Sequence, residues 1–312
     1  MWRVDPAGVA LRSQKAIKRR TYAVEAPNSL WHLDGNHKLI RWRIVIHGAV
    51  DGYSRLITFM KASTNNRATT VQTNFKEAVD QYGIPSRIRC DYGGENQLVR
   101  SFMEENRGTG RGSAICGKSV HNQRIERLWR DLWDGATNTY YDLFTAFERD
   151  NLLNPNSEEQ LYALHYIFLP RIQHAIDTFV KQWNHHKLRT ENMSPVQLFV
   201  EGSLQLYNSA NTATRGIFAG NHPSSSAENT SDAESLPDTI HARDNSSDSD
   251  RVSELDIAVV IVTIPDTVGL LSENALDTLK EHIDPLSNIE AADMGLSHYL
   301  GVLDFISENM NL

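Results

Sequence analysis

The 312-residue chain has few cysteines and no long hydrophobic run, and each shortage excludes a class of protein. Two cysteines, Cys90 and Cys116, cannot build a disulfide scaffold or a zinc site of four cysteines. The longest apolar run, 257–264, is far shorter than the ~20 residues that cross a bilayer. The N-terminal residues lack the apolar core of a signal peptide. We therefore expect a soluble protein in a reducing compartment, with no membrane partner.

Acidic residues outnumber basic ones, but the excess lies entirely in the C-terminal third. The formal net charge is −8. Residues 1–200 hold 27 Lys and Arg against 20 Asp and Glu, a balance of +7, whereas residues 201–312 hold 4 against 19, a balance of −15. A basic part followed by an acidic one is compatible with binding to nucleic acid, although many enzymes are equally basic.

Composition divides the chain into four parts. Residues 1–28 carry basic side chains and little apolar periodicity, which indicates a basic arm or, equally well, a solvated linker. Residues 29–202 have the apolar content of a folded core. Residues 203–250 are rich in Ser, Asn and Asp, which predicts a disordered linker that the core does not need for folding. Residues 251–312 regain apolar character and are predicted to form a small acidic C-terminal segment.

Short apolar runs predict an α/β fold for the core. Runs at 29–34, 43–50 and 56–62 are connected closely enough to form an antiparallel meander. A fourth strand at 86–90 follows a helix, and strand–helix–strand order implies a parallel neighbour. We interpret Asp51, before Gly52, as a turn residue.

Helical periodicity covers much of the rest of the chain. A stripe over 69–82 ends at Gly83, and a longer one begins near His121 and continues to Phe147. Between them, Gly108–Gly117 is predicted to be a mobile loop. Further helical patterns lie at 169–183, 272–283 and 297–309, and the run at 257–264 resembles a strand.

Three acidic residues stand at informative places in this pattern. Asp34 ends the first predicted strand, Asp91 ends the fourth, and Glu126 lies in the helix that follows the glycine-rich stretch. Each alone is explained as a turn, cap or solvated residue. Three converging carboxylates would repel one another unless a cation lay among them, and oxygen ligands suit Mg²⁺ or Mn²⁺. Two such ions ~3.5–4 Å apart can activate an attacking oxygen and stabilise the leaving oxygen of a phosphodiester.

A helical wheel places Glu126 at the margin of the apolar stripe and not opposite it. Asn122 and Arg130 share that margin, whereas Arg124 and Arg127 are predicted to point outward. A polar strip beside the core face is typical of a helix that lines one wall of a cleft.

With these residues in place, the chain resembles the catalytic cores of retroviral-type integrases and DDE transposases, which share the ribonuclease H fold. It is most similar to integrase-core proteins of animal and fungal genomes that derive from mobile elements. The similar segments are LWHLDGNHKL around Asp34, AVDGYSRLI at 49–57, IPSRIRCDYGGEN at 84–96, HNQRIERLWRD at 121–131 and QWNHHKLRTENMSPVQLF at 182–199.

The resemblance implies a five-stranded mixed sheet with helices on both faces. It makes Asp34, Asp91 and Glu126 the catalytic residues, which would bind two Mg²⁺ or Mn²⁺ ions. The implied activity is that of a polynucleotidyl transferase that cleaves and joins DNA strands in integration or transposition. DNA is then the partner, a homo-oligomer the active form, and the location nuclear or nucleo-cytoplasmic. Candidate DNA contacts are Lys118, Asn122, Arg127 and Arg130, although a solvated helix face explains Arg127 equally well.

The chain also departs from the family, because it shows no His/Cys zinc pattern before the core and an acidic region after it. A domesticated core that serves as a non-catalytic scaffold for nucleic acid or protein therefore remains the alternative, and a nuclease for RNA–DNA hybrids is a third. Glu95 could support Asp91 or be solvated. Cys90 is interpreted as inert packing, and Trp129 as core packing in preference to base stacking.

Overall fold

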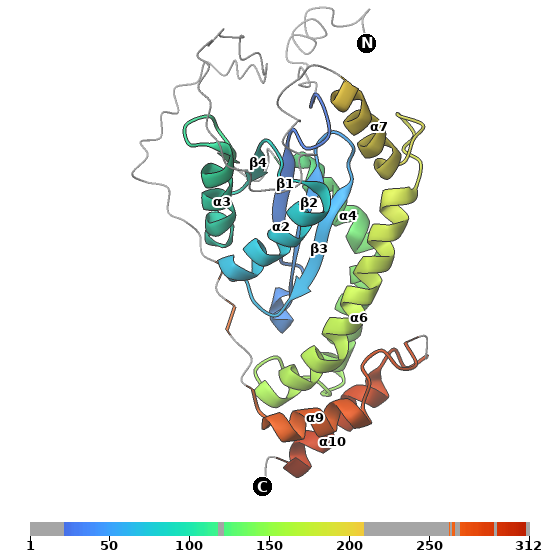
Figure 1. Ribbon diagram of the computed structural model, residues 1–312. Coiled ribbons are helices and arrows are strands. Elements are labelled where there is room, and N and C mark those ends of the chain that lie inside the picture. Colours follow the sequence, from blue (N-terminus) through green and yellow to red (C-terminus); the bar gives the residue numbers. More distant parts are fainter. Residues whose placement is uncertain are drawn as a thin grey trace, which may run out of the picture.

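The computed structural model describes residues 22–117, 122–208, 262, 264, 265, 269–289 and 292–309. In this part of the chain a mixed sheet carries helices on both faces, and a long helix leads from it to a C-terminal helical pair (Figure 1). Most of the predicted arm and linker, and nearly all of the apolar run at 257–264, lie outside the described residues. None of the described helices is long and apolar enough to span a membrane.

The described residues contain one five-stranded sheet with the order β3-β2-β1-β4-β5. Its members are β1 (Trp31–Asn36), β2 (Val45–Asp51), β3 (Ile57–Ser63), β4 (Ile88–Cys90) and β5 (Ala114–Cys116). The first three strands pair antiparallel, whereas β4 pairs parallel to β1 on one side and to β5 on the other. The predicted meander and the predicted mixed sheet are both confirmed.

The fifth strand corrects the prediction of a loop over Gly108–Gly117. Its three residues pair with β4, with Ile88 opposite Ala114 and Cys90 opposite Cys116. A strand of three residues is too short to show an alternating pattern in the sequence. It forms because the neighbouring strand β4 supplies its backbone hydrogen bonds. Only the tertiary arrangement therefore reveals it.

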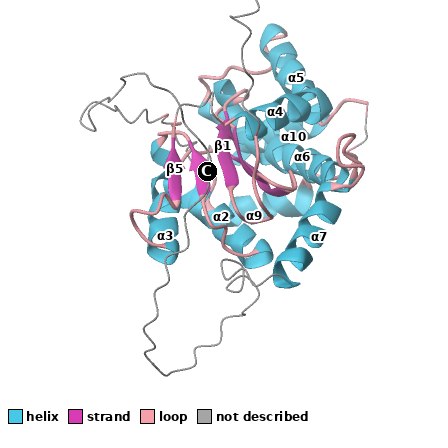
Figure 2. Ribbon diagram, turned by 90° about the horizontal axis from the view of Figure 1, so that it is seen from above, coloured by secondary structure: helices cyan, strands magenta, loops and turns pink. Residues whose placement is uncertain are grey.

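One face of the sheet is covered by α2 (Ala68–Tyr82) and α3 (Gln97–Arg107). Trp31 and Leu33 of β1 pack there against Phe75 of α2. The view from above in Figure 2 shows these helices on one side of the strands, and α4, α5, α6 and α10 on the other. The predicted placement of helices on both faces is confirmed.

The second face carries the larger core, built from α4 (Gln123–Leu132), α5 (Asn138–Arg149) and α6 (Glu158–His185). A π-helical turn, Trp133–Thr137, joins α4 to α5, so the long predicted stripe is one helical path with an irregular centre. Helix α6 begins well before the predicted start at 169. The Ser157 side chain caps it by accepting a hydrogen bond from the Gln160 backbone.

The C-terminal helices belong to this second core. After α7 (Pro195–Asn208) come α9 (Glu273–His282) and α10 (Leu296–Asn309), close to the predicted spans. Tyr299 of α10 is fully buried against Phe147 and Phe168, and its hydroxyl donates to the Leu152 carbonyl at 3.0 Å. The core boundary predicted at residue 202 falls inside α7, and the segment after 251 contributes side chains to the core.

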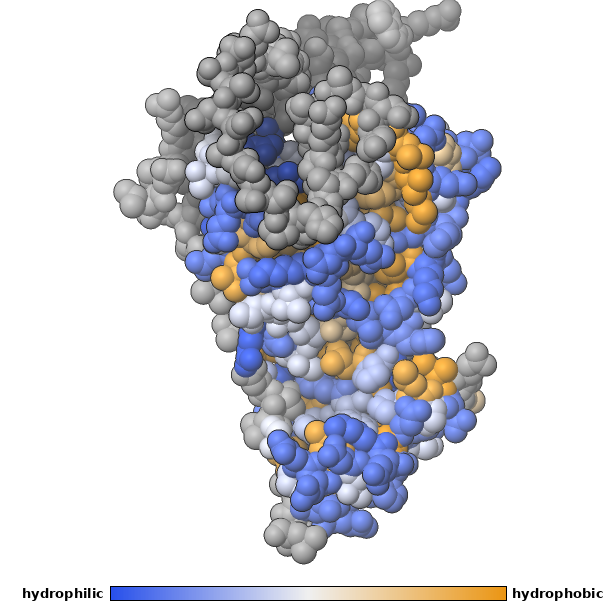
Figure 3. Space-filling model, viewed as in Figure 1, coloured by the Kyte–Doolittle hydropathy of each residue, from blue (hydrophilic) through white to orange (hydrophobic). Residues whose placement is uncertain are grey.

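Helix α7, the last described element before residue 262, exposes apolar side chains to solvent. Val200 and Leu204 are 51% and 58% exposed. Hydrophobic residues are visible among hydrophilic ones over this part of the surface (Figure 3).

Candidate functional site

Strand pairing places Asp34 and Asp91 at the same end of the sheet. Strand β1 runs parallel to β4 with Trp31 opposite Ile88. Continuing that register by three residues brings Asp34 level with Asp91, which directly follows β4. Asp34 lies within β1, which continues to Asn36, so the prediction that Asp34 ends the first strand is wrong. Asp91 follows the carboxyl end of β4, the edge at which α/β sheets commonly bind ligands.

The Asp34 carboxylate is largely buried and is held by one side chain. The indole Nε1 of Trp129 donates to Asp34 Oδ2 at 2.8 Å. Burial raises the pKa of Asp34 to about 7, the Trp129 hydrogen bond opposes this rise, and the negative charges of Asp91 and Glu126 add to it. The three predicted carboxylates therefore lie near enough to one another to interact.

Glu126 reaches this site from the first turn of α4, which packs across β1. Its side chain is exposed, as expected for the margin of the buried stripe formed by Ile125, Leu128 and Leu132. The predicted core packing of Trp129 is found as well, since this residue is only 9% exposed. Its indole nitrogen nevertheless serves Asp34, so Trp129 joins the core to the site.

Asp91 is fixed by the turn that follows β4. Its Oδ1 accepts hydrogen bonds from the Gly93 backbone and from Asn96 Nδ2, both at 3.0 Å. Glu95 in the same turn is buried, and both burial and the charge of Asp91 raise its pKa. The sequence left open whether Glu95, four residues after Asp91, supports Asp91 or is solvated, and the burial of Glu95 argues against the solvated alternative.

A buried hydrogen-bond chain runs beside Asp34. Asn122, which precedes α4, accepts a hydrogen bond from His32 Nδ1 on its Oδ1 at 2.6 Å, and its Nδ2 donates to the Leu33 carbonyl at 2.8 Å. The Tyr22 hydroxyl contacts the other nitrogen of His32 at 2.7 Å. Burial lowers the pKa of His32 to about 4, so the ring is neutral at pH 7. The amide of Asn122 is thus used inside the protein, which corrects its interpretation as a DNA contact.

The other predicted DNA contacts differ in position. Arg127 and Arg130 are exposed on α4, and Arg127 lies 3.9 Å from Asp131. Arg124 was predicted to point outward, but its guanidinium lies over the Tyr22 ring, 4.2 Å from the centroid. Lys118 lies outside the described residues.

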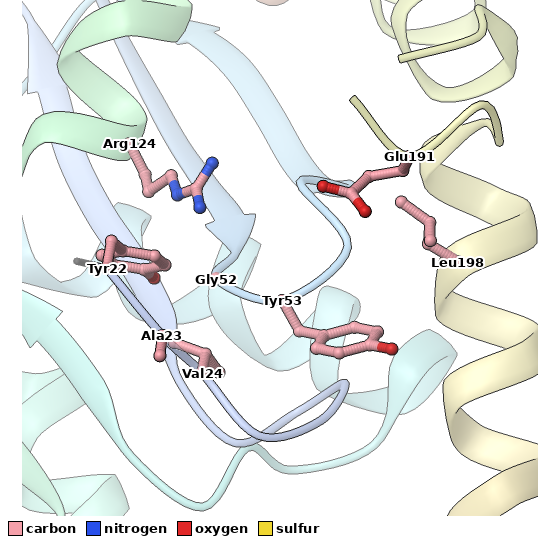
Figure 4. Close-up of a pocket in the computed structure, with 8 residues that line it drawn as sticks. All are labelled: Tyr22, Ala23, Val24, Gly52, Tyr53, Arg124, Glu191 and Leu198. Atoms are coloured by element: carbon pink, nitrogen blue, oxygen red, sulfur yellow. The ribbon is translucent and has the colours of Figure 1, made fainter. Parts of the chain in front are cut away.

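A shallow pocket of about 190 Å³ lies beside this cation–π pair. Figure 4 shows Arg124 and Tyr22 on one side of it, with Glu191 and Leu198 facing them from the loop before α7 and from α7 itself. None of the three predicted catalytic carboxylates lines it. The pocket is therefore separate from the acidic site.

The donor set at the acidic site has the right chemistry for a hard divalent cation. Carboxylate oxygens are preferred ligands of Mg²⁺, and a cation would offset the repulsion that raises the pKa of Asp34. Burial lowers the pKa of His37, and the charge of Asp91 opposes this. The Nε2 atom of His37 is buried and has no hydrogen-bond partner among the described residues. Among the described residues, however, no three His, Cys, Asp or Glu side chains are grouped so that they could hold a metal ion. Binding would therefore require the three carboxylates to draw closer.

The chain matches the model of a known protein family. The integrase core domain model matches residues 21–213, more than half of the chain. The chain therefore belongs to the integrase core domain family, and the sheet order and flanking helices are those of its ribonuclease H-like core.

Similar solved structures come from retroviruses. The HTLV-2 integrase catalytic core domain in complex with magnesium, in a trimeric form, is 15% identical, with a TM-score of 0.39, over 56% of this chain and 97% of that one. The catalytic core domain of BIV integrase is 17% identical, with a TM-score of 0.39, over 58% of this chain and 99% of that one. The simian T-cell lymphotropic virus intasome in complex with the PP2A regulatory subunit B56 gamma is 16% identical, with a TM-score of 0.37, over 69% and 63%. A search of curated proteins gives no match.

Proposed function

We propose that this chain is a metal-dependent polynucleotidyl transferase that cuts and joins DNA strands. The observation that carries the proposal is that the negative charges of Asp91 and Glu126 both add to the raised pKa of the partly buried Asp34. Burying a carboxylate between two others is costly unless a cation compensates. Membership of the integrase core domain family supports the same chemistry.

Asp34, Asp91 and Glu126 would hold the ions. When bound, two divalent cations lower the pKa of an attacking hydroxyl and stabilise the leaving oxygen of a phosphodiester. The protein side chains supply position: Trp129 fixes one oxygen of Asp34, and Asn96 fixes one oxygen of Asp91. Water or a DNA 3′-hydroxyl would then attack the phosphorus directly, with no covalent bond to the enzyme.

DNA would approach over the end of the sheet where these carboxylates lie. Arg127 and Arg130, both exposed on the same helix as Glu126, would meet its phosphates. We further propose that the active form is a homo-oligomer and that the protein acts in the nucleus or shuttles between nucleus and cytoplasm.

Strand nicking and strand transfer on supercoiled plasmid, with Mg²⁺ or Mn²⁺, test the proposal. Asp91→Asn should abolish nicking, because a neutral amide holds Mg²⁺ poorly in a site that depends on carboxylate charge. DNA binding should persist or strengthen slightly, and it should weaken steeply with salt as counterions are released. Asp80→Asn, the same change at an exposed position of α2, is the matched control and should nick like the wild type.

Two outcomes would contradict the proposal. Equal nicking by wild type and Asp91→Asn would assign the activity to another site or to a contaminant. Salt-sensitive DNA binding without nicking, over a range of metals and DNA ends, would favour the non-catalytic scaffold.

A further inference from the structure

The two cysteines of the chain face each other across neighbouring strands. Cys90 ends β4 and Cys116 ends β5, and the two residues are paired in the parallel register. Their sulfur atoms lie 3.9 Å apart, and both thiols are free. The chain contains no other cysteine, so each has a single partner within its own fold.

This placement is compatible with a disulfide bond. Paired strands lie ~4.8 Å apart, and disulfides join residues whose Cα atoms are ~4.4–6.8 Å apart. A pair in register on neighbouring strands is therefore expected to have a Cα distance in this range. Bond formation needs the two sulfur atoms to approach by side-chain rotation, and β5, as an edge strand held on one side only, can adjust.

The surroundings of the two thiols are unequal. Cys90 is buried among the side chains of the α2–α3 face, whereas Cys116 is half-exposed. The hydrogen bond with Cys90 lowers the pKa of Cys116, burial opposes this, and the positive charge of Arg100 of α3 lowers it further. A neighbouring cation favours the thiolate, which is the form that attacks an oxidant. Because Cys116 is the more exposed of the two, it is the sulfur that an oxidant in solvent reaches first, and Cys90 lies behind it.

We propose that Cys90 and Cys116 form a site of reversible oxidation by a hydroperoxide. The Cys116 sulfur attacks the O–O bond, takes up one oxygen as a sulfenic acid and releases water or an alcohol. The Cys90 thiol then attacks that sulfur; an S–S bond forms, the S–O bond breaks, and the hydroxyl leaves as water with the thiol proton. Two electrons pass from the thiols to the peroxide. Cys90 is packed in the core as predicted, and in this proposal it also acts as the resolving thiol.

Hydrogen peroxide and the reduced full-length protein test this directly. After treatment and alkylation, the intact wild-type chain should lose the mass of two hydrogen atoms and take up no alkyl group. Peptide mapping without reductant should recover one species that joins the Cys90 and Cys116 peptides, and dithiothreitol should release it. Circular dichroism before and after treatment checks that the fold persists.

Single variants separate the two roles. Cys90→Ser should stop at a sulfenic acid on Cys116 that a dimedone probe captures, because no resolving thiol remains. Cys116→Ser should leave Cys90 reduced at the same dose, because that thiol is buried. Overoxidation of Cys116 in the wild type without a cross-link, a disulfide between two chains, or equal reactivity of Cys90 in Cys116→Ser would overturn the proposal. Neither result depends on the nicking assay.

Discussion

Arg171 of α6 should be one of the most stabilising polar side chains of this protein. It is 1% exposed, and its guanidinium donates to the Pro285 carbonyl at 2.7 Å and to the Ser287 carbonyl at 2.9 Å. These two carbonyls belong to the loop between α9 and α10. A single buried side chain thus binds the C-terminal helical pair to the long helix.

The cost of removing it follows from these contacts. Arg171→Met keeps most of the apolar length but leaves two partly buried carbonyl oxygens without this donor, at up to about 1–3 kcal/mol each. Loss of the desolvation cost of the charge offsets part of this. We expect the free energy of unfolding to fall by about 2–4 kcal/mol. The free energy of unfolding of Arg171→Lys should lie between those of the wild type and Arg171→Met, because an ammonium lacks the planar fork with which the guanidinium reaches both carbonyls.

Urea unfolding of the full chain, followed by circular dichroism, measures the change. Hydrogen exchange should show the largest loss of protection in α9 and α10. Arg149→Met is the matched control: this arginine is exposed on α5, and its replacement should leave stability unchanged. A change of less than about 0.5 kcal/mol in Arg171→Met would refute the reasoning, since it would mean that the C-terminal pair does not depend on this side chain.

Gly295 offers an independent test of the same contact. Its φ is +97°, and a Cβ atom there would lie 2.9 Å from the Arg171 guanidinium carbon. Gly295→Ala should therefore destabilise the protein in the Arg171 background. Combined with Arg171→Met, part of this effect should disappear, because the clash is relieved and only the backbone strain persists.

Two further predictions concern the sheet and the acidic site. Burial lowers the pKa of His47 from 6.5 to about 4, so the unfolded chain binds the proton first as the pH falls. The contribution of His47 to the free energy of unfolding is therefore present above pH 6.5 and should decline by about 3 kcal/mol towards pH 4. Urea unfolding of His47→Gln over the same pH range should show a flatter decline. Trp129→Phe removes the indole that donates to Asp34, and this loss should raise the pKa of Asp34 further. The pH profile of metal-dependent nicking should then move to higher pH. An unchanged profile in a folded variant would exclude a positioning role for Trp129.

Sequence alone determined the local elements and the order of the acidic residues. The helix over 69–82 is nearly identical to α2, because a buried stripe and the terminating Gly83 are both local signals. The three antiparallel strands were equally clear, since short connections leave strands few other ways to pair. The places of Asp91 after a strand and of Glu126 on a helix margin followed from the same patterns, whereas Asp34 lies within β1 and not at its end.

Only the tertiary structure decided what meets across long stretches of chain. Strand β5 forms because β4 supplies its hydrogen bonds, and three residues are too few to show a pattern that predicts a strand. Trp129 looked like simple packing because periodicity reports which face is buried but not which carboxylate lies beneath an indole nitrogen. Arg171 was invisible for the same reason, since its acceptors lie more than a hundred residues away. Periodicity records the environment of a residue, whereas partners in contact depend on how distant segments are brought together.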